Sequence, residues 1–142
     1  MRSLSLEAMP ELEHLNVVSN RIAAIDLTKS PKLKYVSLSK NFNIASLDLS
    51  KSKALEQLYI ATNSLTSLNL DNVPELRVLD LSGNTGIKSV DLSKIPLLEE
   101  YFGIKTSIAE IDITQNTRLR RLNVSSNAAL KSIKFSSLSN LQ

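Results

Sequence analysis

The sequence predicts a β-rich solenoid with little helix, in which short coils of chain stack on one another. Three observations indicate this fold. First, an eleven-residue stretch, clearest in 74-PELRVLDLSGN-84, occurs in six versions along the chain. Second, successive copies start 21 or 22 residues apart, and a fixed period of this length is typical of solenoids. Third, each copy contains short Leu-x-Leu alternations, which indicate half-buried strands.

Each copy consists of two halves, and each half should contribute one short strand. The first half reads x-L-x-x-L-x-L-x-x-N, and the second reads x-x-I-x-x-L-D-L-S-K, as in 85-TGIKSVDLSK-94. A sustained 3.6-residue period, the sign of an amphipathic helix, is absent. We therefore expect two short parallel strands per coil. The copies begin at Pro10, Pro31, Lys53, Pro74, Pro96 and Thr117.

The chain should form one solenoid over residues 1–142, with about six and a half coils at this repeat length. It starts in the middle of a repeat, because 3-SLSLEAMP-10 aligns with the second half 67-SLNLDNVP-74. At the other end, 132-SIKFSSLSNL-141 completes one coil and begins another. Neither end has the atypical capping segment that solenoids usually carry. We expect a fragment of a longer array, with uncapped ends that can associate end to end.

Two sets of repeated residues should point inward, because a single coil cannot bury its own apolar side chains. The turn after each first strand should also leave backbone groups in the interior, and an inward amide can satisfy them. We interpret the amide column as structural; it comprises Asn20, Asn41, Asn63, Asn84 and Asn127, with Thr106 in the fifth copy. The aliphatic columns include Leu12, Leu15, Val17, Leu33, Val36, Leu38, Leu55, Leu58, Ile60, Leu76, Leu79 and Leu81, and in the second halves Ile22, Ile25, Leu27, Ile44, Leu47 and Leu49.

A column of acidic residues in the second halves raises the question of a metal site, because stacked carboxylates can bind calcium. Asn69 interrupts this column, Lys134 ends it, and no compact D-x-D-x-D-G loop occurs. We favour outward carboxylates screened by Lys29, Lys51 and Lys94. No metal or cofactor is predicted. The column comprises Asp26, Asp48, Asn69, Asp91 and Asp112.

The pattern L-x-x-L-x-L-x-x-N resembles the leucine-rich repeat. The doubled unit ending in LDLSK is similar to the short nested repeats of bacterial surface proteins, such as internalin-like adhesins and cell-surface proteins of Bacteroidetes. The resemblance covers essentially the whole chain. It implies a right-handed leucine-rich-repeat solenoid in a protein that is secreted or displayed at the cell surface. The fold is a general recognition scaffold, so it does not identify the partner.

Residues between the inward leucines of the first strands should face outward in columns and form the binding surface. Exposed aromatic and aliphatic residues grouped on one sheet mark contact surfaces, although such residues also suit strands for packing reasons alone. Tyr35 and Tyr59 lie in adjacent columns on adjacent strands, so their rings should meet diagonally. We predict a partner-binding set of His14, Tyr35, Gln57, Tyr59, Val78, Asp80, Glu100, Phe102, Ile104 and Arg121 on the concave, first-strand face.

The fifth copy, 96-PLLEEYFGIKT-106, departs from the pattern because Tyr101 and Gly103 occupy core positions. We favour compensation, in which the Tyr101 ring fills the volume that Gly103 leaves. The alternative is a local irregularity of the sheet that reshapes the surface near Phe102, since glycine within a strand often marks a bulge.

Composition excludes several classes of function. The chain has no cysteine, which excludes disulfides, thiolate zinc sites and cysteine nucleophiles. It has one histidine, so no Ser-His-acid arrangement can be argued, and the Asp80 and Glu100 carboxylates lie on a shallow sheet without an enclosing pocket. We therefore expect no enzyme. Residues 117–142 are basic but lack a recognised nucleic-acid module, and no apolar run is long enough to cross a membrane.

The sequence thus favours non-catalytic recognition and adhesion through the first-strand face, with a protein as the preferred partner and a glycan as the second choice. Two alternatives remain at this point. One is an intracellular scaffold or effector module, and the other is a structural spacer of a surface protein.

Overall fold

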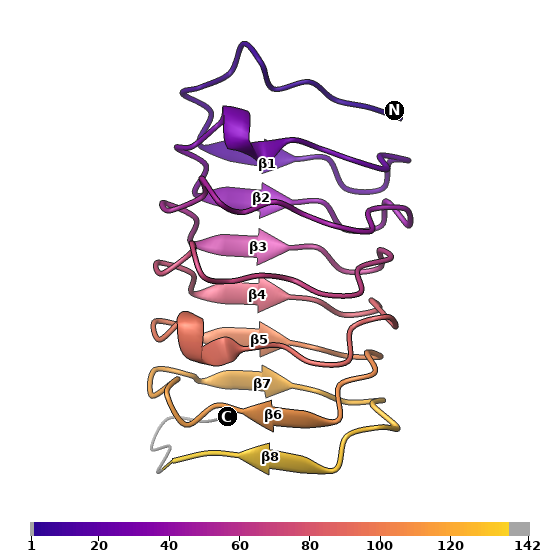
Figure 1. Cartoon of the computed structure of the whole chain (residues 1–142), viewed down its shortest axis with the longest axis vertical. Coiled ribbons are helices and arrows are strands. Elements are labelled where there is room, and N and C mark those ends of the chain that lie inside the picture. The colour runs from indigo at the N-terminus through magenta and orange to yellow at the C-terminus, as the bar shows by residue number, and fades with distance from the viewer. Residues whose placement is uncertain (1, 137–142) are drawn as a thin grey trace.

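A computed structural model describes residues 2–136 as a single stack of coils. Figure 1 shows six strands of one sheet stacked along the long axis of the molecule. All neighbouring strands are parallel, in the order β1-β2-β3-β4-β5-β7. These strands are β1 (His14–Asn16), β2 (Tyr35–Ser37), β3 (Gln57–Tyr59), β4 (Val78–Asp80), β5 (Glu100–Phe102) and β7 (Arg121–Asn123). The predicted β-rich solenoid with little helix is confirmed.

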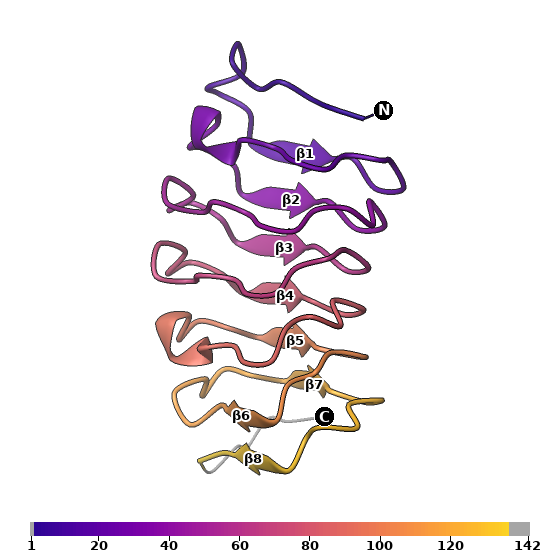
Figure 2. The same ribbon diagram turned by 45° about the vertical axis from the view of Figure 1, so that its right-hand side comes forward.

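The second strands form regular pairs only at one end of the molecule, not in every coil as predicted. β6 (Glu110–Asp112) pairs with β8 (Ser132–Lys134), and Figure 2 shows the earlier return segments running without strands. Two of these segments end in single 3-10 turns, η1 (Leu27–Lys29) and η2 (Leu92–Lys94). Isolated backbone hydrogen bonds join only some neighbouring return segments of the irregular coils, as from Ser64 N–H to the Ile44 carbonyl at 3.0 Å and from Ser107 N–H to the Ile87 carbonyl at 2.9 Å. Such isolated bonds are too few to build a ladder.

The aliphatic columns fill the interior as predicted. Leu33, Leu58, Leu79 and Leu81 have no exposed surface. Four residues that the sequence places in the interior are only partly buried: Leu12, Val17, Ile25 and Leu47. Leu12 and Val17 belong to the first full coil, and Ile25 and Leu47 belong to a column of the return segments that also leaves Leu68 and Val90 partly buried.

The asparagine column is structural, as predicted. The Asn84 amide donates to the Ile60 and Leu81 carbonyls, both at 2.9 Å, and its Oδ1 accepts from Leu65 N–H at 3.1 Å. The amides of Asn41, Asn63, Asn84 and Asn127 therefore each join their own coil to the preceding one. In the fifth copy, the Thr106 hydroxyl donates to the Gly103 carbonyl at 3.3 Å, and the Thr106 N–H donates to Asn127 Oδ1 at 2.7 Å.

A second feature of this turn is absent from the prediction. The residue before each Asn, or before Thr106, has a left-handed backbone with φ between 53° and 74°. A left-handed conformation is uncommon outside glycine, yet glycine occupies it only once. The six residues are Ser19, Lys40, Thr62, Gly83, Lys105 and Ser126.

The fifth copy shows compensation rather than irregularity. The Tyr101 side chain is fully buried, and a Cβ placed on Gly103 would lie 2.7 Å from its hydroxyl oxygen. The sheet keeps its register, because Tyr101 pairs with Leu79 and with Leu122. The alternative of a distorted sheet is therefore wrong. The Tyr101 hydroxyl has no hydrogen-bond partner within residues 2–136, and burial raises its pKa.

The predicted start of a further coil falls in residues 137–142 and lies outside the described residues.

Candidate interaction surface

The large sheet presents one continuous outer face, which we call the strand face. The strand pairing puts six residues in one column (His14, Tyr35, Gln57, Val78, Glu100 and Arg121) and six in a second (Asn16, Ser37, Tyr59, Asp80, Phe102 and Asn123). These are the columns that the repeat alignment predicts. In the first column, His14 and Arg121 at the two ends are exposed and the residues between them are half-buried. In the second column, Asn16 and Asn123 at the ends are exposed, and Ser37 is buried.

Aromatic rings form a row across the first three strands. The His14 and Tyr35 rings stack with centroids 4.2 Å apart and planes 8° apart. The Tyr35 and Tyr59 rings meet at 5.5 Å and 43°, which confirms the predicted diagonal contact. The Tyr59 hydroxyl donates to Gln57 Oε1 at 3.3 Å, and burial is the main cause that raises its pKa. The stacking of His14 was not predicted, although its position beside Tyr35 in one column indicates it.

The other half of the strand face combines apolar and charged groups. Val78, Phe102 and Ile104 are half-buried. Glu100 forms an ion pair with Arg121 at 3.4 Å, and Asp80 accepts from Ser82 N–H at 2.9 Å. The structure therefore gives the two carboxylates separate partners.

The acidic column of the return segments caps local turns. Asp26 Oδ1 accepts from Thr28 N–H at 2.9 Å, and Asn69 Oδ1 accepts from Asp71 N–H at 2.8 Å in the same way. The hydrogen bonds from the Thr28 side chain and backbone, more than the nearby Lys29, hold the pKa of Asp26 below its usual value. The predicted outward position is confirmed, but the capping role was missed. Within residues 2–136, no three or more His, Cys, Asp or Glu side chains lie close enough together to hold a metal ion.

Comparisons with known proteins support the fold. A family model described as "Leucine Rich repeat" matches residues 74–95. A leucine-rich-repeat protein of Leptospira interrogans superposes with a TM-score of 0.78 at 18% identity, covering 92% of this chain and 38% of that chain. This chain is a leucine-rich-repeat solenoid.

Two further solved structures resemble this leucine-rich-repeat solenoid. YopM from Yersinia enterocolitica has a TM-score of 0.66 at 22% identity, covering 89% of this chain and 33% of that chain. An internalin, InlF, from Listeria monocytogenes has a TM-score of 0.50 at 17% identity, covering 93% and 50%. The leucine-rich-repeat solenoid thus spans a third to a half of the solved chains it resembles. No match was found among curated proteins.

The two edges of the leucine-rich-repeat solenoid differ in charge. The strand-start edge comprises the loops that lead into the large sheet, 10–13, 31–34, 53–56, 74–77, 96–99 and 117–120. It carries ion pairs between successive coils, such as Lys34–Glu13 and Arg77–Glu99, both at 2.9 Å. The strand-end edge comprises the turns that follow the strands, 18–23, 39–45, 61–66, 82–88, 104–109 and 125–131. It contains no Asp or Glu, and its cations are Arg21, Lys40, Lys88, Lys105 and Lys131.

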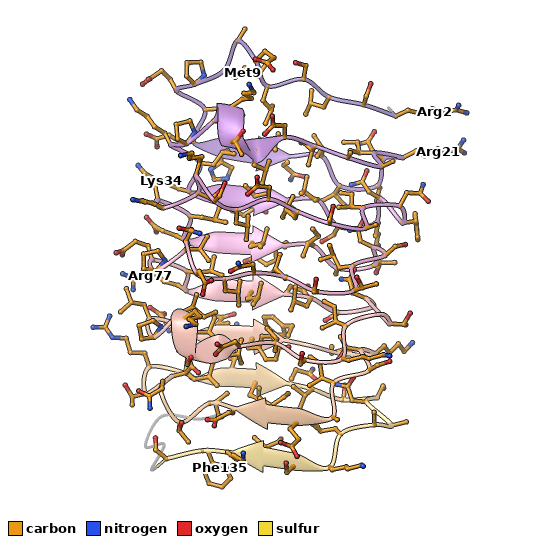
Figure 3. The ribbon with its side chains drawn as sticks, viewed as in Figure 1. Arg2, Met9, Arg21, Lys34, Arg77 and Phe135 are labelled. Atoms are coloured by element: carbon orange, nitrogen blue, oxygen red, sulfur yellow. The ribbon has the colours of Figure 1, made fainter. Side chains whose placement is uncertain are left out.

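Figure 3 shows this separation directly. Lys34 and Arg77 project from one side of the leucine-rich-repeat solenoid, and Arg2 and Arg21 project from the opposite side. This asymmetry was not predicted, because it becomes visible only when charges are sorted by their position in the repeat and not along the chain. Among residues 2–136, no helix is long and apolar enough to cross a bilayer.

Proposed function

We propose that this chain binds a protein partner through the strand face. The leucine-rich-repeat fold implies a protein-interaction module. The observation that supports it is the row of His14, Tyr35 and Tyr59 rings, held in contact on three adjacent strands. Aromatic side chains pre-ordered by their neighbours lose little conformational entropy on binding, and they are enriched among the residues that dominate binding energy.

The shape of the face favours a protein over a small molecule. Small ligands bind in concave sites that bury most of their surface, whereas the strand face is a row of half-buried side chains on a parallel sheet. Val78, Phe102 and Ile104 extend the apolar area. Two carboxylates lie within it, because Asp80 stands between Tyr59 and Phe102 in one column and Glu100 follows Val78 in the other. A partner surface that combines apolar and polar groups fits this distribution.

A triple variant tests the proposal. Tyr35→Ser, Tyr59→Ser and Phe102→Ser together should abolish capture of the partner in a pull-down from the source organism, while the circular dichroism spectrum stays that of the wild type. Phe135→Ser is the matched control, because Phe135 is 67% exposed and lies outside the strand face. If the triple variant retains the partner, the binding surface lies elsewhere.

We also propose that the protein acts outside the cell, as the resemblance to internalin-like adhesins implies. Protease treatment of intact cells should remove it if it is displayed at the surface, and its survival under conditions that cleave known surface proteins would contradict this.

A further inference from the structure

A pocket lies at the strand-end edge between the turns after β1 and β2. It has a volume of about 450 Å³. Its lining comprises Arg2, Ser19, Asn20, Arg21, Lys40 and Phe42. Arg2 and Arg21 project from this same edge in Figure 3. The pocket therefore brings together residues from three successive coils.

The charges of the pocket are uncompensated. Arg2, Arg21 and Lys40 are exposed, and none of them forms an ion pair with a carboxylate among residues 2–136. The lining contains no acidic residue. Three like charges around one pocket repel each other, and an anion in the middle relieves that repulsion.

Phe42 is unusual in both its side chain and its backbone. The side chain is 58% exposed, so it gains little from burial in this chain. Its φ is +68°, in the left-handed region that bulky residues avoid. None of the residues at the same position of the other copies has a positive φ; they are Arg21, Ser64, Thr85, Ser107 and Ala128. Strained residues of this kind cluster at binding sites, where the strain positions a side chain.

We infer that this pocket binds a carboxylate side chain of a protein partner, with an adjacent apolar side chain of that partner packed on Phe42. Arg21 and Lys40 supply charged donors for the carboxylate, and hydrogen bonds between ions are stronger than those between neutral groups. The inference rests on the proposed function only in that the partner is a protein; it does not depend on the strand face.

The chemistry of the pocket favours a carboxylate next to an apolar group over a free phosphate. Phosphate sites typically use backbone N–H groups at a helix N-terminus or a glycine-rich loop. This pocket instead offers side-chain cations and one exposed ring. An acidic peptide segment with an aromatic or aliphatic residue matches both features.

Isothermal titration calorimetry with a synthetic peptide tests the inference. The probe has glutamates flanking a central phenylalanine, and the same peptide with glutamine in place of glutamate is its control. The double variant Arg21→Gln, Lys40→Gln should lose about ten-fold or more in affinity, as expected for two charge-assisted contacts. The double variant Lys88→Gln, Lys105→Gln removes the same charge from the same edge outside the pocket and should bind like the wild type.

Phe42→Asn separates a binding role from a structural one. Asparagine tolerates a left-handed backbone better than phenylalanine does, so this variant should melt at a higher temperature and yet bind the peptide more weakly. A purely structural Phe42 would leave peptide affinity unchanged.

Other outcomes overturn the inference. These are absence of binding by the wild type, equal losses in both double variants, and binding of inorganic phosphate without binding of the peptide. The strand-face triple variant should bind the peptide normally. If it loses the peptide while the pocket variant keeps it, the pocket assignment fails and the strand-face proposal stands.

Discussion

The two edges of this solenoid join successive coils in different ways. At the strand-start edge, exposed side chains form ion pairs across coils, as between Lys34 and Glu13. At the strand-end edge, buried amides such as those of Asn41 and Asn84 bind the backbone carbonyls of the preceding coil. Exposed ion pairs contribute little to stability, whereas an unsatisfied buried polar group is costly. Backbone hydrogen bonds join successive coils at both edges, as from Lys34 N–H to the Glu13 carbonyl at 2.9 Å, so the difference lies in the side chains. Buried amides reinforce the backbone bonds at the strand-end edge, which leaves the surface cations of that edge for other contacts.

The largest effect should come from the buried amide. Asn84→Ala removes two bonds to carbonyls and leaves the Leu65 N–H without its partner. We expect a loss of about 1–3 kcal/mol in the free energy of unfolding. Urea denaturation measures this loss. A loss no larger than that of an ion-pair variant at the opposite edge would remove the proposed difference between the edges.

A smaller effect should come from the strongest ion-pair cluster of the strand-start edge. The Glu99 carboxylate contacts Arg77 at 2.9 Å and Arg120 at 2.8 Å, and all three side chains are at least partly exposed to solvent. Glu99→Gln should lower the free energy of unfolding by less than about 1 kcal/mol. Added salt should shrink the difference from the wild type because it screens the charges. A salt-independent loss would show that the contact stabilises the fold by packing instead.

The smallest effect should be a pH dependence caused by the acidic turn caps. Hydrogen bonds from Thr28 hold the pKa of Asp26 below its usual value, so this contribution is present above about pH 4 and is lost as the pH falls through the lowered pKa. Melting temperatures measured from neutral pH downward should show the loss.

Asp26→Asn should flatten that pH dependence and keep the turn, because Asn69 already caps its own turn in this way. Lys88→Gln, at the edge that has no acidic residue, is the matched control and should leave the fall in melting temperature at low pH unchanged. If Asp26→Asn also leaves that fall unchanged, other carboxylates cause it.

The sequence predicts most of this fold because each column of residues recurs in several copies of the repeat. The alignment places Tyr35 opposite Gln57 and Tyr59 opposite Asp80, as the strand pairing has them. Features that occur once could not be predicted in the same way. Asn116 donates hydrogen bonds from its buried amide to the Leu92 and Ile95 carbonyls. The aligned residues in the other copies are serine or apolar, so this amide is not part of a repeated column and could not be predicted from the alignment.

The candidate sites show the same limit. The residues of the strand face follow from the repeat, although their role in binding is still a prediction. The left-handed backbone of Phe42 does not follow from the repeat, because the aligned residues have ordinary φ values and nothing in the local sequence requires the strain. The missing second strands could not be predicted either, because the same alternation of apolar residues occurs in return segments that pair and in those that do not.

The constant register of the large sheet also bears on how such a protein changes over generations. Each strand meets the next through equivalent residues, as Leu15 meets Val36 and Val36 meets Leu58. Loss of one whole unit by unequal recombination would place Leu15 against Leu58 and leave every other junction intact. The length of the molecule can therefore change by one coil at a time, whereas a deletion of half that size would place a return segment where a strand of the large sheet belongs.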